Sequence, residues 1–217
     1  MNLAVSNLAV DRGERRIISD LTFNVEAGQA LLLRGRNGAG KTTLIRTIAG
    51  FLTPASGEMR LDGGDEEQSL AEQAHYVGHL NGVKANLTVG ENLDFWSRYL
   101  DPDAKGSERT MRIDDALETF SLLDLEDIPA AYLSAGQKRR VGLARLKLAF
   151  RALWLLDEPT VSLDVASVKI LADAVQAHTT AGGIVIAATH IPLGIDKAQT
   201  LELQPHRPSP SATVGLF

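Results

Sequence analysis

The sequence predicts an α/β protein whose central sheet is mostly parallel. Three short runs, residues 29–34, 153–156 and 184–188, are apolar at nearly every position and are bounded by turn or cap residues. Such continuous apolar character is typical of parallel strands that are covered on both faces. A glycine-rich turn follows the first run and leads into residues 42–51, where apolar residues recur at helical spacing. The chain therefore has the order strand, loop, helix.

The first strand is predicted at residues 3–10, ahead of these runs. Farther along the chain, charged and apolar residues alternate at helical spacing through residues 89–99, 112–123 and 135–149. We therefore expect a mostly helical subdomain, about residues 69–150, inserted into the α/β core. A turn-rich break at residues 101–106 lies within it.

Length and composition favour one domain over residues 1–203. The 217 residues and the hydrophobic content of 44% allow one well-buried core. Residues 204–217 contain three prolines and few residues of the buried type, so we expect a disordered tail.

Charge and cysteine content exclude several classes of function. The formal net charge of -5 provides no broad basic surface, so nucleic acid is not an expected partner. The absence of cysteine excludes disulfides, thiolate zinc sites and iron–sulfur clusters. No uncharged apolar run approaches the ~20 residues that span a bilayer, so a membrane role would require a partner.

The glycine-rich turn predicts a phosphate-binding loop. It fits the pattern G-x-x-x-x-G-K-[ST] and lies between a predicted strand and a predicted helix, as the mechanism requires. The glycines let backbone N–H groups converge on phosphate oxygens, the lysine contacts the β- and γ-phosphates, and the threonine hydroxyl coordinates Mg²⁺. The alternative is a glycine-rich turn with a chance lysine. The predicted nucleotide-binding residues here are Gly35, Arg36, Asn37, Gly38, Ala39, Gly40, Lys41, Thr42 and Thr43.

Two adjacent carboxylates, Asp157 and Glu158, end the predicted strand 153–156. Open sheets bind ligands at the carboxyl edge, and side chains alternate along a strand, so the two carboxylates have different roles. Asp157 is placed to bind Mg²⁺, and Glu158 to polarise the water that attacks the γ-phosphate. A solvated acidic strand end is the alternative. Trp154, on the same strand, is predicted to be core.

Further motifs resemble the ATPases of ABC transporters. The segment Leu133-Ser134-Ala135-Gly136-Gln137 resembles their signature sequence, although Ala135 replaces the usual glycine. Asp164 ends a segment similar to the dimer-contacting loop of the family, and His190 matches its switch histidine. A helix cap is a sufficient structural reason for Ser134. The signature residues carried over are Ser134, Ala135, Gly136 and Gln137.

This resemblance implies a phosphate-loop NTPase fold and an ATPase activity. The fold has a mixed, mostly parallel sheet, an N-terminal antiparallel β portion and an inserted helical subdomain. ATP and Mg²⁺ are the implied cofactors, with Glu158 and His190 as catalytic residues. Two copies would pack head to tail, so that the signature of one copy contacts the ATP held by the phosphate loop of the other.

Two positions depart from the wider family. His79 stands where many members have a metal-site glutamine, and a histidine can still hydrogen-bond a metal-bound water. Arg12 stands where an aromatic residue usually stacks on adenine. A guanidinium can stack on a base, and a solvated turn arginine is the equal alternative.

The surrounding sequence resembles the family branch that serves cytochrome c maturation. The resemblance rests on residues 78–84, 87–93, 126–129, 137–141 and 182–190. It implies a peripheral subunit on the cytoplasmic face of the bacterial inner membrane that drives integral membrane subunits to release a haem-loaded chaperone. An ATPase of another exporter, for lipid, drug or polysaccharide, and a nucleotide-dependent regulatory scaffold are the alternatives.

Two further groups of side chains, one aromatic and one basic, lie near these motifs. Phe95, Trp96 and Tyr99 recur at helical spacing, which is typical of core and otherwise indicates contact with the membrane subunits. Lys138, Arg139 and Arg140 are expected to form a solvated helix face.

Overall fold

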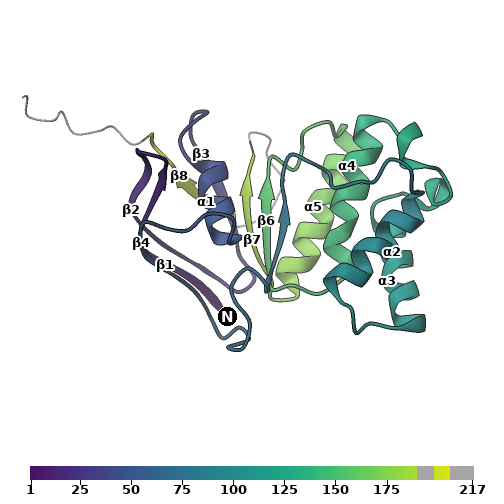
Figure 1. Cartoon of the computed structure of the whole chain (residues 1–217), viewed down its shortest axis with the longest axis horizontal. Coiled ribbons are helices and arrows are strands. Elements are labelled where there is room, and N and C mark those ends of the chain that lie inside the picture. The colour runs from purple at the N-terminus through teal and green to yellow at the C-terminus, as the bar shows by residue number, and fades with distance from the viewer. Residues whose placement is uncertain (190–197, 206–217) are drawn as a thin grey trace, which may run out of the picture.

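The computed structural model describes residues 1–189 and 198–205, which form two sheets and a group of helices. Figure 1 shows the antiparallel sheet and helix α1 (Lys41–Ile48) on one side of the central sheet, with the remaining helices on the other. His190 and most of the predicted tail lie outside the described residues.

The central sheet has five strands in the order β5-β6-β7-β3-β8, and every pair is parallel. The three apolar runs of the sequence form β3, β6 and β7, so these predictions are confirmed. The strands are β3 (Ala30–Arg34), β5 (Ala74–Val77), β6 (Leu153–Asp157), β7 (Ile184–Ala188) and β8 (Gln199–Glu202).

Alternation along these strands divides the core in two. Leu31 and Leu33 of β3 pack toward α1 and the antiparallel sheet, whereas Leu32 packs toward the helices of the other face. Trp154 is 3% exposed and belongs to the second core, as predicted. Because both faces are covered, the strands are apolar at nearly every position.

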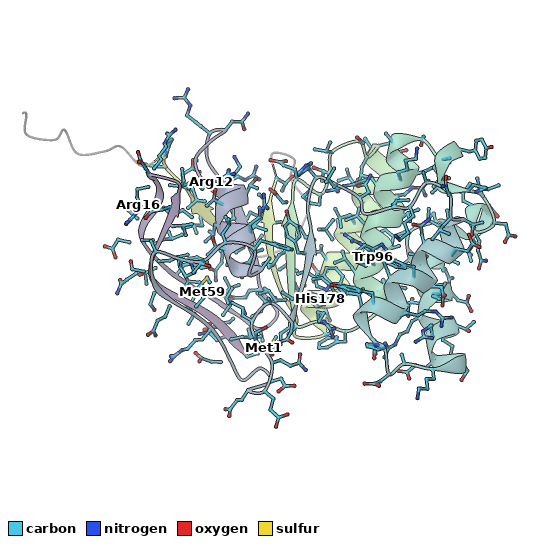
Figure 2. The ribbon with its side chains drawn as sticks, in the orientation of Figure 1. Met1, Arg12, Arg16, Met59, Trp96 and His178 are labelled. Carbon is cyan, nitrogen blue, oxygen red and sulfur yellow. The ribbon has the colours of Figure 1, made fainter. Side chains whose placement is uncertain are left out.

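The antiparallel sheet contains β1 (Asn2–Arg12), β2 (Arg15–Glu26) and β4 (Ser56–Asp62), in the order β2-β1-β4. It confirms the implied N-terminal antiparallel portion. Figure 2 shows Arg12 and Arg16 at the end of the β1–β2 hairpin that lies away from Met1. At that end Arg16 forms an ion pair with Asp11.

The inserted helices begin later than predicted. Strand β5 lies within the expected helical range 69–150 but pairs with β6, so the helical part starts only at α2, where Thr88 forms a capping box with Glu91. The helices of this face are α2 (Val89–Leu100), α3 (Gly106–Thr119), α4 (Ala135–Ala144) and α5 (Val165–Thr180), with short 3₁₀ turns at Leu123–Leu125, Ala130–Tyr132 and Arg145–Lys147. The extent of one domain, residues 1–203, stays a prediction. Within the described part of the chain, no helix is long and apolar enough to cross a membrane.

Candidate nucleotide-binding site

The phosphate loop joins the carboxyl end of β3 to the first turn of α1. Gly35, Gly38 and Gly40 have φ angles of 127°, 82° and 101°, in the left-handed region that favours glycine. A Cβ at Gly35 would lie 2.2 Å from the carbonyl oxygen of Leu203. Glycine therefore lets the loop pass close to the end of β8 and lead into the start of α1, where the helix dipole favours an anion.

Lys41 lies along this loop rather than in solvent. Lys41 is 8% exposed, and its Nζ donates to the carbonyl oxygens of Gly35 (2.8 Å) and Arg36 (3.3 Å). These bonds hold a positive charge against the loop that would surround a phosphate chain.

Thr42 joins the loop to the acidic end of β6. Its hydroxyl donates to Oδ1 of Asp157 at 3.0 Å, although 115 positions separate the two residues. Asp157 is 3% exposed. A hydroxyl and one carboxylate, completed by phosphate oxygens and waters, form a donor set that fits Mg²⁺. The structure thus brings together two of the three predicted metal ligands.

Glu158 has a different orientation and an unusual backbone. Its φ is 49°, left-handed for a residue with a side chain, and its N–H donates to the carbonyl oxygen of Ala188 in β7 (2.8 Å). Glu158 lines a cavity of about 470 Å³ together with the phosphate loop. The other lining residues are Arg12, Arg15, Ile17, Asn37, Gly38, Gly40, Lys41, Thr42 and Thr43.

The signature residues lie on the opposite face of the central sheet from the phosphate loop. Ser134 caps α4, where its hydroxyl accepts from the N–H of Gln137 (3.2 Å) and its own N–H donates to Oε1 of Gln137 (2.8 Å). Helix α4 packs into the core on the side of the helical group, whereas α1 packs into the other core. Ser134 therefore does not face the phosphate loop of its own chain.

The predicted dimer loop packs directly against the signature. A Cβ at Gly136 would lie 2.8 Å from the carbonyl oxygen of Ser162, so only glycine fits there without a shift. Asp164 caps α5 and accepts from the N–H of Ser167 (2.8 Å). Its hydrogen bonds with Ser167 lower the pKa of the Asp164 carboxyl.

Comparison with known proteins identifies the family of this site. The family model described as "ABC transporter" matches residues 18–161, a range that includes the phosphate loop, the signature and the acidic pair. The chain belongs to the ABC transporter ATPase family. Like other ABC ATPases, it binds and hydrolyses ATP.

Two relatives among the ABC ATPases are similar over nearly their full length. The "Cytochrome c biogenesis ATP-binding export protein CcmA" of Agrobacterium fabrum is 46% identical over 205 residues, which cover 94% of this chain and 95% of the relative. The protein of the same name from Rhizobium meliloti is 47% identical over 94% of this chain and 98% of its own. A solved ABC transporter ATP-binding protein from Pyrococcus furiosus aligns with a TM-score of 0.80 and 26% identity, covering 94% of this chain and 98% of that one.

Arg12 and His79, two of the predicted site residues of this ABC ATPase, differ in their position relative to the phosphate-loop cavity. Arg12 is exposed at the end of the β1–β2 hairpin and lines the phosphate-loop cavity. His79 is exposed just after β5 and is not among the described residues that line that cavity. Sequence reasoning missed Arg15, whose Cα pairs with that of Arg12 across the hairpin and which lines the same cavity.

Arg139 is the clearest error of the sequence reasoning. The sequence predicts a solvated helix face of Lys138, Arg139 and Arg140, but Arg139 is only 3% exposed. Its guanidinium donates to backbone carbonyls at the end of β6 and beyond β5. These acceptors are remote in sequence, so the local pattern of three basic residues gave no sign of the burial.

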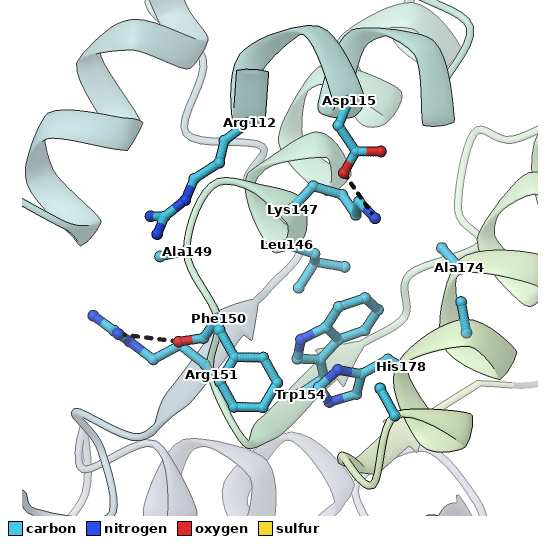
Figure 3. Close-up of a pocket in the computed structure, with 12 residues that line it drawn as sticks. Arg112, Asp115, Leu146, Lys147, Ala149, Phe150, Arg151, Trp154, Ala174 and His178 are labelled. Carbon is cyan, nitrogen blue, oxygen red and sulfur yellow. Dashed lines mark hydrogen bonds and ion pairs between the residues drawn. The ribbon is translucent and has the colours of Figure 1, made fainter. Parts of the chain in front are cut away.

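A second cavity lies beside the start of β6 and the end of α5, at the sheet edge opposite to Asp157. The cavity has a volume of about 310 Å³, and the stacked rings of Trp154 and His178 have their centroids 4.0 Å apart. Figure 3 shows these two side chains among the residues that line it. Lys147 pairs with Asp115 at 2.9 Å. Burial lowers the pKa of the His178 imidazole to about 4. None of the predicted site residues lines this cavity.

Proposed function

We propose that this chain is the ATP-hydrolysing subunit of an export complex for cytochrome c biogenesis, and that its turnover drives release of a haem-loaded chaperone. The relatives named for cytochrome c biogenesis support the subfamily. The observation that most supports the catalytic role is the 3.0 Å hydrogen bond between the Thr42 hydroxyl and the Asp157 carboxylate, because it joins the phosphate loop to the acidic strand end.

The described residues divide the chemistry among them. The loop N–H groups and Lys41 bind the phosphates, while Thr42 and Asp157 would hold Mg²⁺. The metal, when bound, neutralises charge on the phosphate oxygens. Glu158 lines the cavity from the adjacent strand position and orients the attacking water. We assign adenine contact to Arg12, water-mediated metal contact to His79 and γ-phosphate contact to His190.

A second copy of the chain would complete the site. Within one chain, α1 and α4 pack on opposite faces of the sheet, so the signature is available to another copy. Large apolar side chains are exposed around the signature and the dimer loop: Tyr132 is 81% exposed, Val161 56% and Val165 89%. We propose a head-to-tail dimer in which this apolar surface becomes covered, giving two equivalent ATP sites.

The membrane partner would contact a different surface. A groove near β5 and α2 is lined by aromatic and apolar side chains, of which Leu80 is 73% exposed, Tyr99 70% and Phe51 57%. Trp96 lies in the same groove, where its Nε1 donates to the carbonyl oxygen of Gly82 (2.9 Å). Exposed aromatic side chains of this kind suit a protein interface. We propose that integral membrane subunits bind here, which places the chain peripherally on the cytoplasmic face of the inner membrane.

The substitution Glu158→Gln tests the catalytic assignment. The amide cannot act as a base, so the variant should bind ATP, hydrolyse it poorly and accumulate as an ATP-bound dimer. Glu202→Gln is the matched control, because Glu202 ends β8 at the same edge of the sheet but does not line the cavity. Steady-state phosphate release and light scattering on a sizing column report both properties. Near-parental turnover of Glu158→Gln would refute the assignment.

The competing functions require different measurements. A regulatory scaffold would bind ATP without turnover, so phosphate release by the parent protein excludes it. An ATPase of a lipid, drug or polysaccharide exporter would hydrolyse ATP but would co-purify with other membrane subunits than those of cytochrome c maturation. Recovery of the latter subunits supports the proposed complex.

A further inference from the structure

Arg139 connects the signature helix to the catalytic edge of the sheet. From its position in α4, the guanidinium donates to the carbonyl oxygen of Glu158 (2.8 Å) through Nη2 and to that of Pro159 (3.0 Å) through Nε. Its Nη1 donates to the carbonyl oxygen of Gly78 (2.7 Å) and to Oδ1 of Asn81 (3.1 Å). One side chain thus contacts the segment that follows β6, next to Asp157, and the segment that follows β5.

All four acceptors are neutral oxygens, and no described carboxylate forms an ion pair with Arg139. Burial lowers the pKa of the guanidinium, while Asp157 has the opposite effect from a greater distance. A buried cation without a paired anion is costly unless hydrogen bonds compensate it. The four bonds provide that compensation and fix the geometry of the segments that supply them.

The bond to Glu158 reaches a residue with a strained backbone. The φ of Glu158 is 49°, and this conformation persists only where the surroundings hold it. Hydrogen bonds on both sides of the residue hold it here: the Glu158 N–H donates to Ala188, and the Glu158 carbonyl oxygen accepts from Arg139 and from the N–H of Val161 (3.3 Å). The direction of the Glu158 side chain depends on this backbone, and the Arg139 bond (2.8 Å) is the shorter of the two at the carbonyl oxygen, so its loss would move the carboxylate.

The segment after β5, residues 78–81, also packs closely against α4. Gly78 and Asn81 flank His79, and a Cβ at Gly142 of α4 would lie 3.0 Å from the carbonyl oxygen of Asn81. Helix α4 therefore cannot move toward residues 78–81 without displacing them, and the Arg139 bonds to Gly78 and Asn81 oppose movement away from them. Since α4 begins at the signature, a displacement of the signature would reach both segments through Arg139.

We propose that Arg139 is a positioning residue that couples the signature of a chain to the Glu158 of the same chain. Contact between Ser134 and the nucleotide of a second copy thereby adjusts the Glu158 carboxylate that serves the chain's own nucleotide. This coupling rests on the proposed ATPase function. It gives the two sites of a dimer a direct path for communication, carried by one side chain.

The test compares Arg139→Gln with Arg140→Gln. Arg140 is the matched control, because it is the next residue of α4 and also donates to two backbone carbonyls, those of Phe120 (3.0 Å) and Ser121 (2.8 Å), away from the catalytic edge. Arg139→Gln should lower kcat by about 10²-fold, as expected for a misplaced catalytic group, while ATP affinity stays near the parental value. Arg140→Gln should leave kcat close to parental, and Arg139→Lys should recover part of the loss.

A double substitution separates positioning from general destabilisation. If Arg139 acts through Glu158, adding Arg139→Gln to Glu158→Gln should cause little further loss in single-turnover hydrolysis. An additive loss, or equal losses of kcat in Arg139→Gln and Arg140→Gln, would overturn the proposal. Should Arg139→Gln not fold, Asn81→Ala removes one of the four acceptors, and an unchanged kcat would count against the coupling. Failure of the ATPase assignment is distinct, since the parent protein would then release no phosphate, and failure of the Glu158 assignment would appear as normal turnover in Glu158→Gln alone.

Discussion

The substitution Thr42→Val tests the contact that joins the two halves of the nucleotide site. Valine has nearly the same shape as threonine but cannot donate a hydrogen bond. The Thr42 hydroxyl donates to Oδ1 of Asp157 at 3.0 Å, and Asp157 is only 3% exposed. The variant therefore removes a donor from a buried carboxylate and a ligand from the proposed magnesium site.

The burial of Asp157 determines how much stability the variant should lose, and the loss of a magnesium ligand determines how its ATP affinity should change. Leaving a buried acceptor without its donor costs about 1–3 kcal/mol, and more when the acceptor is charged. For a domain of this size each kcal/mol corresponds to about 2–4 °C in Tm. We therefore expect the nucleotide-free variant to unfold about 4–8 °C below the parent, for a loss of about 2 kcal/mol. Its affinity for ATP in the presence of Mg²⁺ should fall to the value measured with EDTA.

Thr47→Val provides the matched control for this variant. Thr47 is buried in the same helix, and its hydroxyl donates to the carbonyl oxygen of Thr43 (2.8 Å), so the same chemical change leaves no carboxylate unpaired. Thermal unfolding and nucleotide titrations with and without Mg²⁺ measure both effects. If Thr42→Val kept the parental response to Mg²⁺, the role of Thr42 as a magnesium ligand would be refuted.

Two further predictions concern the signature and the buried histidines. Gly136→Ala would bring a Cβ to 2.8 Å from the carbonyl oxygen of Ser162, so kcat should fall while ATP affinity is kept. Gly90→Ala in α2 serves as control, because its Cβ would meet only the side chain of Glu126, and equal kcat values would contradict the steric argument. Burial lowers the pKa of His75 and of His178 from 6.5 to about 4, so the unfolded chain binds more protons between these values. The stability that each neutral histidine provides is complete above pH 6.5 and is lost as pH falls toward 4. Urea unfolding should show about 2 kcal/mol less stability per histidine at pH 5 than at pH 8, and a flat profile would contradict this assignment.

The sequence predicted the central strands because their environment leaves a local signal. Strands β3, β6 and β7 are covered on both faces and read as apolar runs. Strands β2 and β4 were missed because half of the residues of β2 and most of those of β4 are exposed, so they lack continuous apolar character. Their position depends on pairing with β1, which no local pattern encodes.

The same distinction applies to the site. The phosphate loop and the acidic pair were predictable because glycine dihedrals and strand-end carboxylates are local requirements of the chemistry. The burial of Arg139 was not, because it depends on Gly78, Glu158 and Pro159, which lie between 19 and 61 positions away. A run of basic residues on a helix is ordinarily solvated, and only the tertiary structure shows the exception.

The central claim is that each ATP site is built by two copies of the chain, and a mixing experiment tests it directly. Lys41→Ala inactivates the phosphate loop and leaves the signature intact, while Ser134→Arg does the reverse. Each variant alone should lack ATPase activity. In an equimolar mixture, half of the dimers would pair the two variants and contain one intact site of two, so activity should recover to about one quarter of the parental value. A mixture of folded, nucleotide-exchanged variants that stays as inactive as its components would contradict the head-to-tail site.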